Sequence, residues 1–118
     1  MARILVVDDS AVYRTSMKEL LQNAGHTVVG EAVNGDEGVT KYMELFPDIT
    51  TMDVMMPIKG GLEALDEILI FDPHAKVIMV SATAQQSKIS QALIQGAYCF
   101  LRKPIDPEKL HRALDSIH

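Results

Sequence analysis

Short apolar runs alternate along the chain with longer segments in which apolar residues recur every three or four positions. The runs are typical of buried strands and the longer segments of amphipathic helices. We expect strands at residues 4–7, 27–30, 48–52, 76–80 and 98–102. We expect helices at residues 10–25, 34–46, 62–71, 85–95 and 107–117. Five strands that alternate with five helices over short connections predict a parallel sheet covered by helices on both faces.

Turn and cap residues support these boundaries. Gly25 and Gly96 are good helix stops, Pro47 ends the second helix, and Pro107 suits the start of the last one. The apolar stripes predict that the following residues face inward: Val12, Met17, Leu20, Leu21 and Ala24 in the first helix, Val39, Tyr42, Met43 and Phe46 in the second, Leu62, Leu65, Ile68 and Leu69 in the third, Ile89, Ala92 and Leu93 in the fourth, and Leu110, Ala113, Leu114 and Ile117 in the fifth. No repeat or linker interrupts the pattern, so we expect a single domain over residues 1–118.

The composition favours a soluble cytoplasmic protein. The chain has 118 residues, of which 47% are apolar, enough for one compact domain. Its longest apolar runs are four or five residues, whereas a membrane span needs about 20. The start has no features of a signal peptide. Cys99 is the single cysteine, which suits a reducing compartment, and we expect it to be buried filler and not a catalytic thiol.

The net charge of −5 is unevenly distributed. Residues 1–83 hold 13 acidic and 6 basic residues, whereas residues 84–118 hold 3 acidic and 5 basic residues. Nucleic acid is disfavoured as a partner, because phosphate contacts need a dense basic patch. The basic C-terminal third could meet an acidic protein surface, although a solvated helix face would explain the same asymmetry equally well.

Polar residues that could form one site follow four of the predicted strands. Asp8 and Asp9 follow the first, Asp53 the third, Ser81 the fourth and Lys103 the fifth. Because open α/β sheets build their sites at the carboxyl ends of the strands, we expect these residues to meet.

Their chemistry suits phosphoryl transfer. Adjacent carboxylates repel one another unless a cation holds them, and Mg²⁺ takes such oxygen ligands. A carboxylate can also attack phosphorus, while an ammonium and a hydroxyl can contact phosphate oxygens. Each residue alone is explained as well by a helix cap, a turn or a solvated side chain. Their joint order on successive strand ends is what predicts the site.

Four motifs together resemble the receiver domain of two-component response regulators. They are Val6-Val7-Asp8-Asp9-Ser10, Asp53-Val54-Met55-Met56-Pro57 with Gly61, Val80-Ser81-Ala82, and Lys103-Pro104. The resemblance covers essentially the whole chain and is closest to the CheY-like single-domain chemotaxis regulators, to which residues 81–86 contribute. It implies one doubly wound, flavodoxin-like (βα)5 domain with the strand order 2-1-3-4-5 that is known for CheY itself.

The resemblance also implies the role of each acidic residue. Asp53 would be the phosphoacceptor. Asp9, Asp53 and the backbone carbonyl of Met55 would bind Mg²⁺ directly, and Asp8 would act mainly through water. The methionine at position 55 cannot orient a water molecule, so we expect slow self-dephosphorylation; Thr83 is the other position that influences water access in this family.

A switch and a set of partners follow from the same resemblance. Ser81 and Lys103 would contact the phosphoryl oxygens, and Phe100 would be the switch aromatic. The Lys103–Pro104 bond is expected to be cis. The phosphate would come from a histidine kinase, a phosphatase is a further possible partner, and the chain would act as a monomer, with chemotaxis output to the flagellar motor. The candidate output face comprises Lys88, Phe100, Arg102, Lys109 and Arg112.

Two other functions stay open on sequence alone. The chain could be the receiver of a transcription factor or of a phosphorelay, although the last helix ends close to residue 118 and so favours a free-standing regulator. A phosphohydrolase of the haloacid-dehalogenase type would need an Asp-x-Asp pattern and usually a cap domain, whereas the chain has Asp8-Asp9-Ser10-Ala11 and no room for a cap. The receiver reading implies no enzyme activity beyond the chain's own phosphorylation and dephosphorylation.

Overall fold

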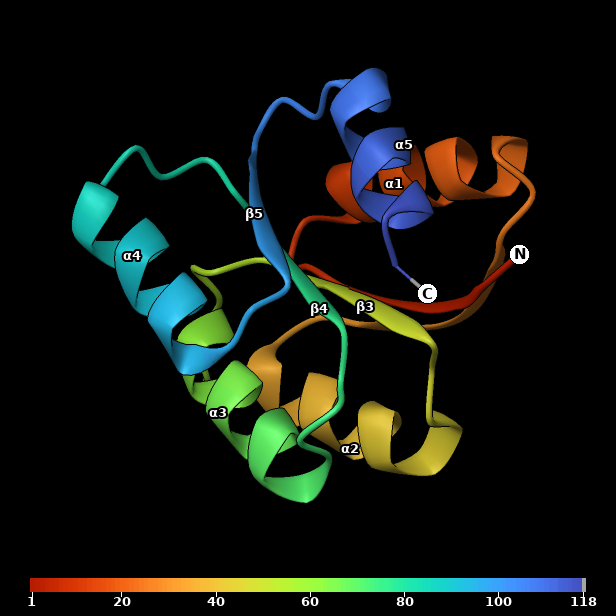
Figure 1. Ribbon diagram of the computed structural model, residues 1–118. Helices are drawn as coiled ribbons and strands as arrows, with labels where there is room; N and C mark the ends of the chain where they lie inside the picture. The colour runs from red at the N-terminus through yellow and green to blue at the C-terminus, as the bar shows by residue number, and fades with distance from the viewer. Residues whose placement is uncertain (118) are drawn as a thin grey trace.

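Five parallel strands form one sheet in the order β2-β1-β3-β4-β5 (Figure 1). The computed structural model describes residues 1–117, so the last residue of the expected domain lies outside the described part. The strands are β1 Arg3–Val7, β2 Thr27–Ala32, β3 Ile49–Met52, β4 Val77–Ser81 and β5 Cys99–Arg102. The helices are α1 Ala11–Asn23, α2 Gly35–Leu45, α3 Gly61–Phe71, α4 Gln86–Gln95 and α5 Pro107–Asp115. The predicted (βα)5 fold and strand order are therefore confirmed.

Helices cover both faces of the sheet. Helices α1 and α5 lie on one face, and α2, α3 and α4 lie on the other (Figure 1). Side chains alternate along β1, so Ile4 and Val6 pack with the first pair of helices while Leu5 and Val7 pack with the other three. Because β1 is buried on both faces, its last four residues are all apolar.

Local interactions set the helix ends. The Ser10 hydroxyl accepts a hydrogen bond from the Tyr13 N–H at the start of α1, and Asn34 and Asp106 cap α2 and α5 in the same way. Gly96 ends α4 with φ of +119°, a conformation that glycine adopts without strain. Phe46 leaves the right-handed helical region before Pro47, as the sequence predicts, and takes φ of +46°.

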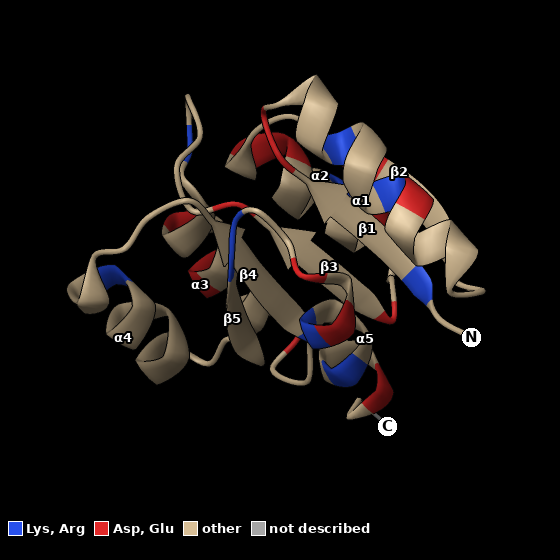
Figure 2. Cartoon of the chain, turned by 90° about the horizontal axis from the view of Figure 1, so that it is seen from above, with Lys and Arg blue, Asp and Glu red and all other residues tan. Residues whose placement is uncertain are grey.

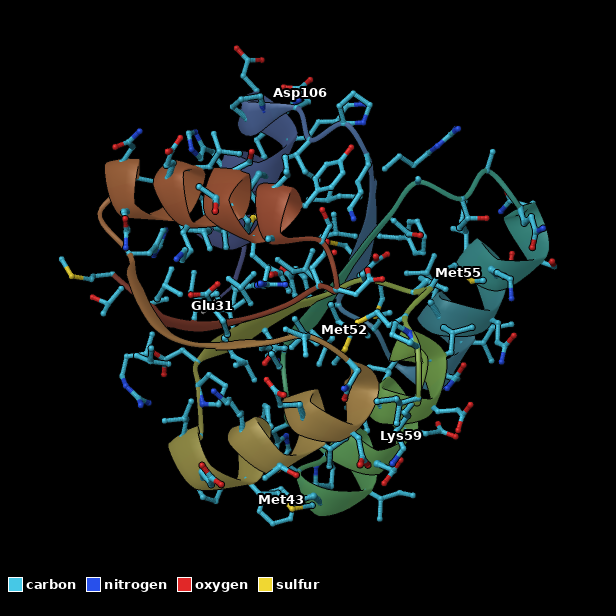
Figure 3. The ribbon with its side chains drawn as sticks, turned by 180° about the vertical axis from the view of Figure 1, so that it is seen from behind. Glu31, Met43, Met52, Met55, Lys59 and Asp106 are labelled. Atoms are coloured by element: carbon cyan, nitrogen blue, oxygen red, sulfur yellow. The ribbon has the colours of Figure 1, made fainter. Side chains whose placement is uncertain are left out.

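Five residues that we expected to face inward are exposed, namely Val12, Ala24, Met43, Phe46 and Leu93. Val12 is 74% exposed, because the buried stripe of α1 runs through Met17 and Leu21. Phe46 lies beyond the end of α2 and packs against Phe71, with 5.5 Å between the centroids of the two tilted rings. Met43 lies on the outer side of α2 (Figure 3).

Cys99 is half-buried, and burial raises the pKa of its thiol. A thiol with a raised pKa is a poor nucleophile at neutral pH, which agrees with its expected role as filler. Among residues 1–117, no helix combines the length and the apolar character needed to cross a membrane.

Candidate functional site

The register of the sheet brings the predicted strand ends to one level. Val7 pairs with Met52, and Ser81 pairs with Arg102. The next residues are anchored by backbone hydrogen bonds: the N–H of Asp53 donates to the Val7 carbonyl at 3.0 Å, and the N–H of Lys103 donates to the Ser81 carbonyl at 2.9 Å. The side chains that follow the strands therefore begin from fixed points at one sheet edge.

The Lys103 ammonium lies between two buried carboxylates. Its Nζ donates to Asp8 Oδ2 at 2.7 Å and to Asp53 Oδ2 at 3.3 Å, and its side chain is only 7% exposed. Burial lowers the pKa of Lys103, but the hydrogen bonds and charges of the two carboxylates outweigh burial and hold that pKa above its ordinary value. The ammonium is thus charged at neutral pH.

Burial has the opposite effect on Asp53. It raises the pKa of the Asp53 carboxyl, the Lys103 charge offsets part of this rise, and the nearby Asp8 charge adds to it, so the net pKa lies above its ordinary value. The remaining carboxylate oxygens are also oriented by backbone donors. The N–H of Val54 donates to Asp53 Oδ1 at 2.8 Å, and the N–H of Ser10 donates to Asp8 Oδ1 at 2.9 Å.

The three predicted metal ligands with side-chain oxygens come together. Asp8, Asp9 and Asp53 each place one carboxylate oxygen within 4.8 Å of the others. Asp9 is exposed, whereas the other two are buried. A cluster of hard, anionic oxygens with one solvent-facing member fits Mg²⁺, which usually binds one or two carboxylates and keeps several waters.

A hollow of about 370 Å³ opens beside this cluster. Asp53, Ser81, Lys103, Met55 and Lys88 all contribute to its lining. The Ser81 side chain is buried, and its hydroxyl oxygen accepts a long hydrogen bond of 3.4 Å from the Thr83 N–H. The hydroxyl and the ammonium therefore share one space with the Asp53 carboxylate. Met55 is exposed and lies near α4 (Figure 3).

The predicted switch residue Phe100 is half-buried on β5. It pairs with Met79 of β4 and packs in the cluster below α2, α3 and α4. Ser81 follows Met79 by two residues and so points to the same face of the sheet. Ser81 and Phe100 therefore lie diagonally across from each other on the same face of neighbouring strands.

The expected output face divides into two parts. Arg102, Lys109 and Arg112 are exposed on β5 and α5, and Figure 2 shows basic residues at these places. Lys88 on α4 instead contributes to the hollow that holds Asp53. A substitution at Lys88 would thus alter the site as well as the face.

Sequence reasoning missed two residues that contact the site. The Lys103 Nζ lies 3.9 Å from the centroid of the Tyr13 ring, and Arg14 Nη1 donates to the Asp8 carbonyl at 2.8 Å. Tyr13 could have been found from the helical spacing of the sequence. Met17 and Leu21 are buried in α1, and position 13 lies four residues before Met17 on the same face of the helix.

The sequence also matches a known protein family. The response regulator receiver domain family matches residues 4–115. The chain belongs to this family. As a member of it, the protein has the Lys103–Pro104 bond in the cis form that the resemblance implies.

Relatives of this receiver include chemotaxis proteins and a response regulator of the LuxR family. The chemotaxis protein CheY of Thermotoga maritima is 45% identical over 115 residues, which cover 98% of this chain and 96% of that protein. A chain of the CheX–CheY–BeF₃–Mg²⁺ complex of Borrelia burgdorferi is 33% identical with a TM-score of 0.94, covering 98% of this chain and 87% of that one. A two-component response regulator of the LuxR family from Aurantimonas sp. SI85-9A1 is 32% identical with a TM-score of 0.93, covering 99% and 84%. Both solved structures share the fold of this chain, whereas the relatives differ in the class of regulator to which they belong.

Proposed function

We propose that this receiver is a chemotaxis-type regulator in which Asp53 accepts a phosphoryl group from a histidine kinase in a Mg²⁺-dependent reaction. The observation that carries the proposal is the environment of the Asp53 carboxylate. It lies 3.3 Å from the Lys103 ammonium, within the three-carboxylate cluster, and in the hollow that Ser81 also lines. The 45% identity to a CheY protein supports the chemotaxis assignment.

Each residue has a distinct part in this proposal. An Asp53 carboxylate oxygen forms a bond to phosphorus while the bond from phosphorus to the donor's histidine nitrogen breaks, and that nitrogen keeps the electron pair. Asp9, Asp53 and the Met55 carbonyl would hold Mg²⁺, with Asp8 acting through water. Bound there, the ion would offset the charge that develops on the transferred group.

The output would follow from a local movement. Lys103 and Ser81 would contact the phosphoryl oxygens, and the shift of Ser81 would leave space toward Phe100 on the same face of the sheet. A phosphoryl group adds charge and acceptor oxygens, which need only bias two pre-existing arrangements. The altered face of α4, β5 and α5 would then bind the flagellar motor in the cytoplasm, with the receiver acting as a monomer and a phosphatase ending the signal.

The phosphorylation step is tested by mass spectrometry of the intact protein after treatment with acetyl phosphate and magnesium. We expect one phosphoryl adduct that is absent in Asp53→Asn and absent after chelation of the metal. An adduct that persists in Asp53→Asn would place the phosphoacceptor elsewhere. Steady hydrolysis of varied phosphate esters would instead favour a phosphohydrolase, since a receiver modifies only itself.

A second candidate function is the receiver of a transcription factor or phosphorelay, which the likeness to the LuxR-family regulator supports. The two outputs are distinguished by binding of a purified motor switch protein with and without beryllofluoride, which mimics the phosphoryl group. We expect binding that requires beryllofluoride and is lost when Arg102, Lys109 and Arg112 are replaced by glutamate. Unchanged binding in that variant would place the output face elsewhere.

The lifetime of the phosphoryl group depends on position 55 in this proposal. Met55 lines the hollow next to Asp53 but cannot orient a water molecule. Met55→Asn and Met55→Glu should therefore lose the phosphoryl group faster than the parent protein, as followed by the decay of the adduct after the donor is removed. Equal or longer lifetimes in both variants would show that this side chain does not limit water attack.

A further inference from the structure

The Lys103 ammonium has a third close neighbour besides its two carboxylates. The ring of Tyr13 faces it, with the Nζ 3.9 Å from the ring centroid. A cation over the face of an aromatic ring is attracted by the ring quadrupole, more strongly where water is excluded. The Lys103 side chain is 7% exposed, so the contact lies in a place where this attraction is not screened.

The position of the Tyr13 ring is tied to the acidic cluster. The Tyr13 N–H donates to the Ser10 hydroxyl at 3.3 Å, and the Ser10 N–H donates to Asp8 Oδ1 at 2.9 Å. Arg14 adds a hydrogen bond to the Asp8 carbonyl. The first turn of α1 is therefore held against the residue whose carboxylate also binds the ammonium.

An apolar cavity of about 190 Å³ lies next to the ring. Tyr13 and Lys103 both line it, and Met17, Val80 and Ile105 are among the apolar residues of its wall. A lysine ammonium sits on a flexible four-carbon chain. Tyr13 and Lys103 line the same cavity, so without the ring the ammonium would border a larger open space and the lysine side chain could take several positions.

We propose that Tyr13 is a positioning residue that holds the Lys103 ammonium beside Asp53 through its ring face and thereby raises the rate of phosphorylation. The inference rests on the proposed function, because Lys103 is expected to contact the transferred phosphoryl group. Tyr13 itself would touch neither the donor nor the reacting atoms. Its effect would come from keeping the ammonium where charge develops, with no rearrangement needed at the moment of reaction.

The rate test compares three proteins over a range of acetyl phosphate concentrations with magnesium present. We expect Tyr13→Leu to lower the limiting rate of adduct formation by about three- to tenfold and to leave the half-saturating donor concentration unchanged. Tyr13→Phe should stay within about twofold of the parent, since it keeps the ring face. Tyr98→Leu removes a second half-buried tyrosine, whose hydroxyl shares a hydrogen bond with the hydroxyl of Ser116 just after α5, and it should not change the rate.

Two further measurements separate the ring's charge distribution from its bulk. Pentafluorophenylalanine at position 13 keeps the shape but reverses the quadrupole, so it should behave like Tyr13→Leu. Proton NMR should show the Lys103 side-chain methylene nearest the ammonium shifted upfield by the ring in the parent and in Tyr13→Phe, but not in Tyr13→Leu. A merely structural role for Tyr13 would not produce this pattern.

The outcomes that overturn the inference differ from those that overturn the proposed function. A parent protein that forms no adduct contradicts the proposed function, while the NMR shifts still decide whether the ring holds the ammonium. An adduct that forms equally fast in the parent and in Tyr13→Leu, or a fluorinated ring that behaves like tyrosine, refutes the inference alone. Thermal unfolding of each variant shows whether a slower rate reflects loss of the folded state.

Discussion

Replacing Gly61 with alanine should destabilise this receiver, although alanine is normally favoured over glycine inside a helix by about 1 kcal/mol. Gly61 is the first residue of α3. A Cβ atom at this position would lie 1.9 Å from the Asp53 carbonyl oxygen, 2.8 Å from the Asp53 carbonyl carbon and 3.0 Å from the Val54 Cα. All three obstacles are backbone atoms of Asp53 and Val54, in the loop that follows β3.

The size of the effect follows from this distance. Real Cβ atoms essentially never approach closer than 3.0 Å to another heavy atom, so α3 and the loop would have to separate by roughly 1 Å. Overpacking of this kind costs about 1–3 kcal/mol, and a rigid backbone obstacle favours the upper end. Separation would also weaken the hydrogen bond from the Gly61 N–H to the Val54 carbonyl, now 2.8 Å long. After the gain in helix preference is subtracted, we expect a net loss of about 2 kcal/mol.

The assay is urea unfolding followed by circular dichroism, with Gly60→Ala as the matched control. A Cβ at Gly60 would meet only the Val54 carbonyl oxygen at 3.3 Å, so this variant should lose less than about 1 kcal/mol. The folded fraction of Gly61→Ala should also form the Asp53 adduct more slowly, because the loop is displaced. If Gly61→Ala is as stable as Gly60→Ala, the backbone contact does not constrain the loop and the reasoning fails.

Three further predictions concern stability. The Tyr42 hydroxyl donates to Asp72 Oδ2 at 2.7 Å and lowers the pKa of that carboxyl. Tyr42→Phe should lower the free energy of unfolding by about 0.5–1.5 kcal/mol at neutral pH. The difference in urea midpoint between this variant and the parent should shrink below about pH 4. The sign follows because a carboxyl pKa lowered by folding contributes stability above its unfolded value and loses it as the pH falls through the folded value; a constant difference down to acid pH would contradict this. Ile58 is 84% exposed with φ of +72°, so Ile58→Gly should be neutral or stabilising by about 0.5 kcal/mol. The control is Ile94→Gly, which is 85% exposed inside α4 and should cost about 0.5–1 kcal/mol. Equal effects of the two substitutions on thermal unfolding would rule out strain at position 58. Lys103→Met should lower the free energy of unfolding by about 1–3 kcal/mol without metal. Magnesium chloride should stabilise this variant more than the parent, because the ammonium no longer competes with the cation for carboxylate oxygens. Equal gains in Tm for the two proteins would refute that competition.

The arrangement of strands and helices was predictable because apolar runs and helical stripes differ clearly in this chain. The error at the start of α1 shows where such patterns stop being informative. Val12 is apolar and Tyr13 carries a hydroxyl, so a count of apolar residues favoured the wrong one. The Ser10 cap sets the rotation of the first turn, and with Met17 and Leu21 buried it turns position 13 inward. A prediction of the buried face of α1 that started from the Ser10 cap and included Met17 and Leu21 would have placed Tyr13 on that face.

The polar strand ends were predictable as a group, whereas their partners were not. The positions of Asp8, Asp53 and Lys103 follow from where three strands end. Which oxygens the ammonium binds depends on the path of a flexible lysine side chain and on the burial around it. Neither can be inferred from the spacing of the residues along the sequence. The hydrogen bonds from Lys103 to both carboxylates were therefore visible only in the folded structure.

The charges of the site bear on the role proposed for the Tyr13 ring. Three carboxylates and one ammonium leave a formal charge of −2 in the cluster, which one divalent cation would neutralise. Phosphorylation of Asp53 would replace its single negative charge by about two and would draw the ammonium away from Asp8 toward the new oxygens. The carboxylate contacts of Lys103 would change in that step, whereas the contact between its Nζ and the Tyr13 ring, at 3.9 Å from the ring centroid, involves no carboxylate oxygen. A neutral ring can hold the ammonium in both states without competing with the phosphoryl group for its charge, and a further carboxylate at position 13 could not.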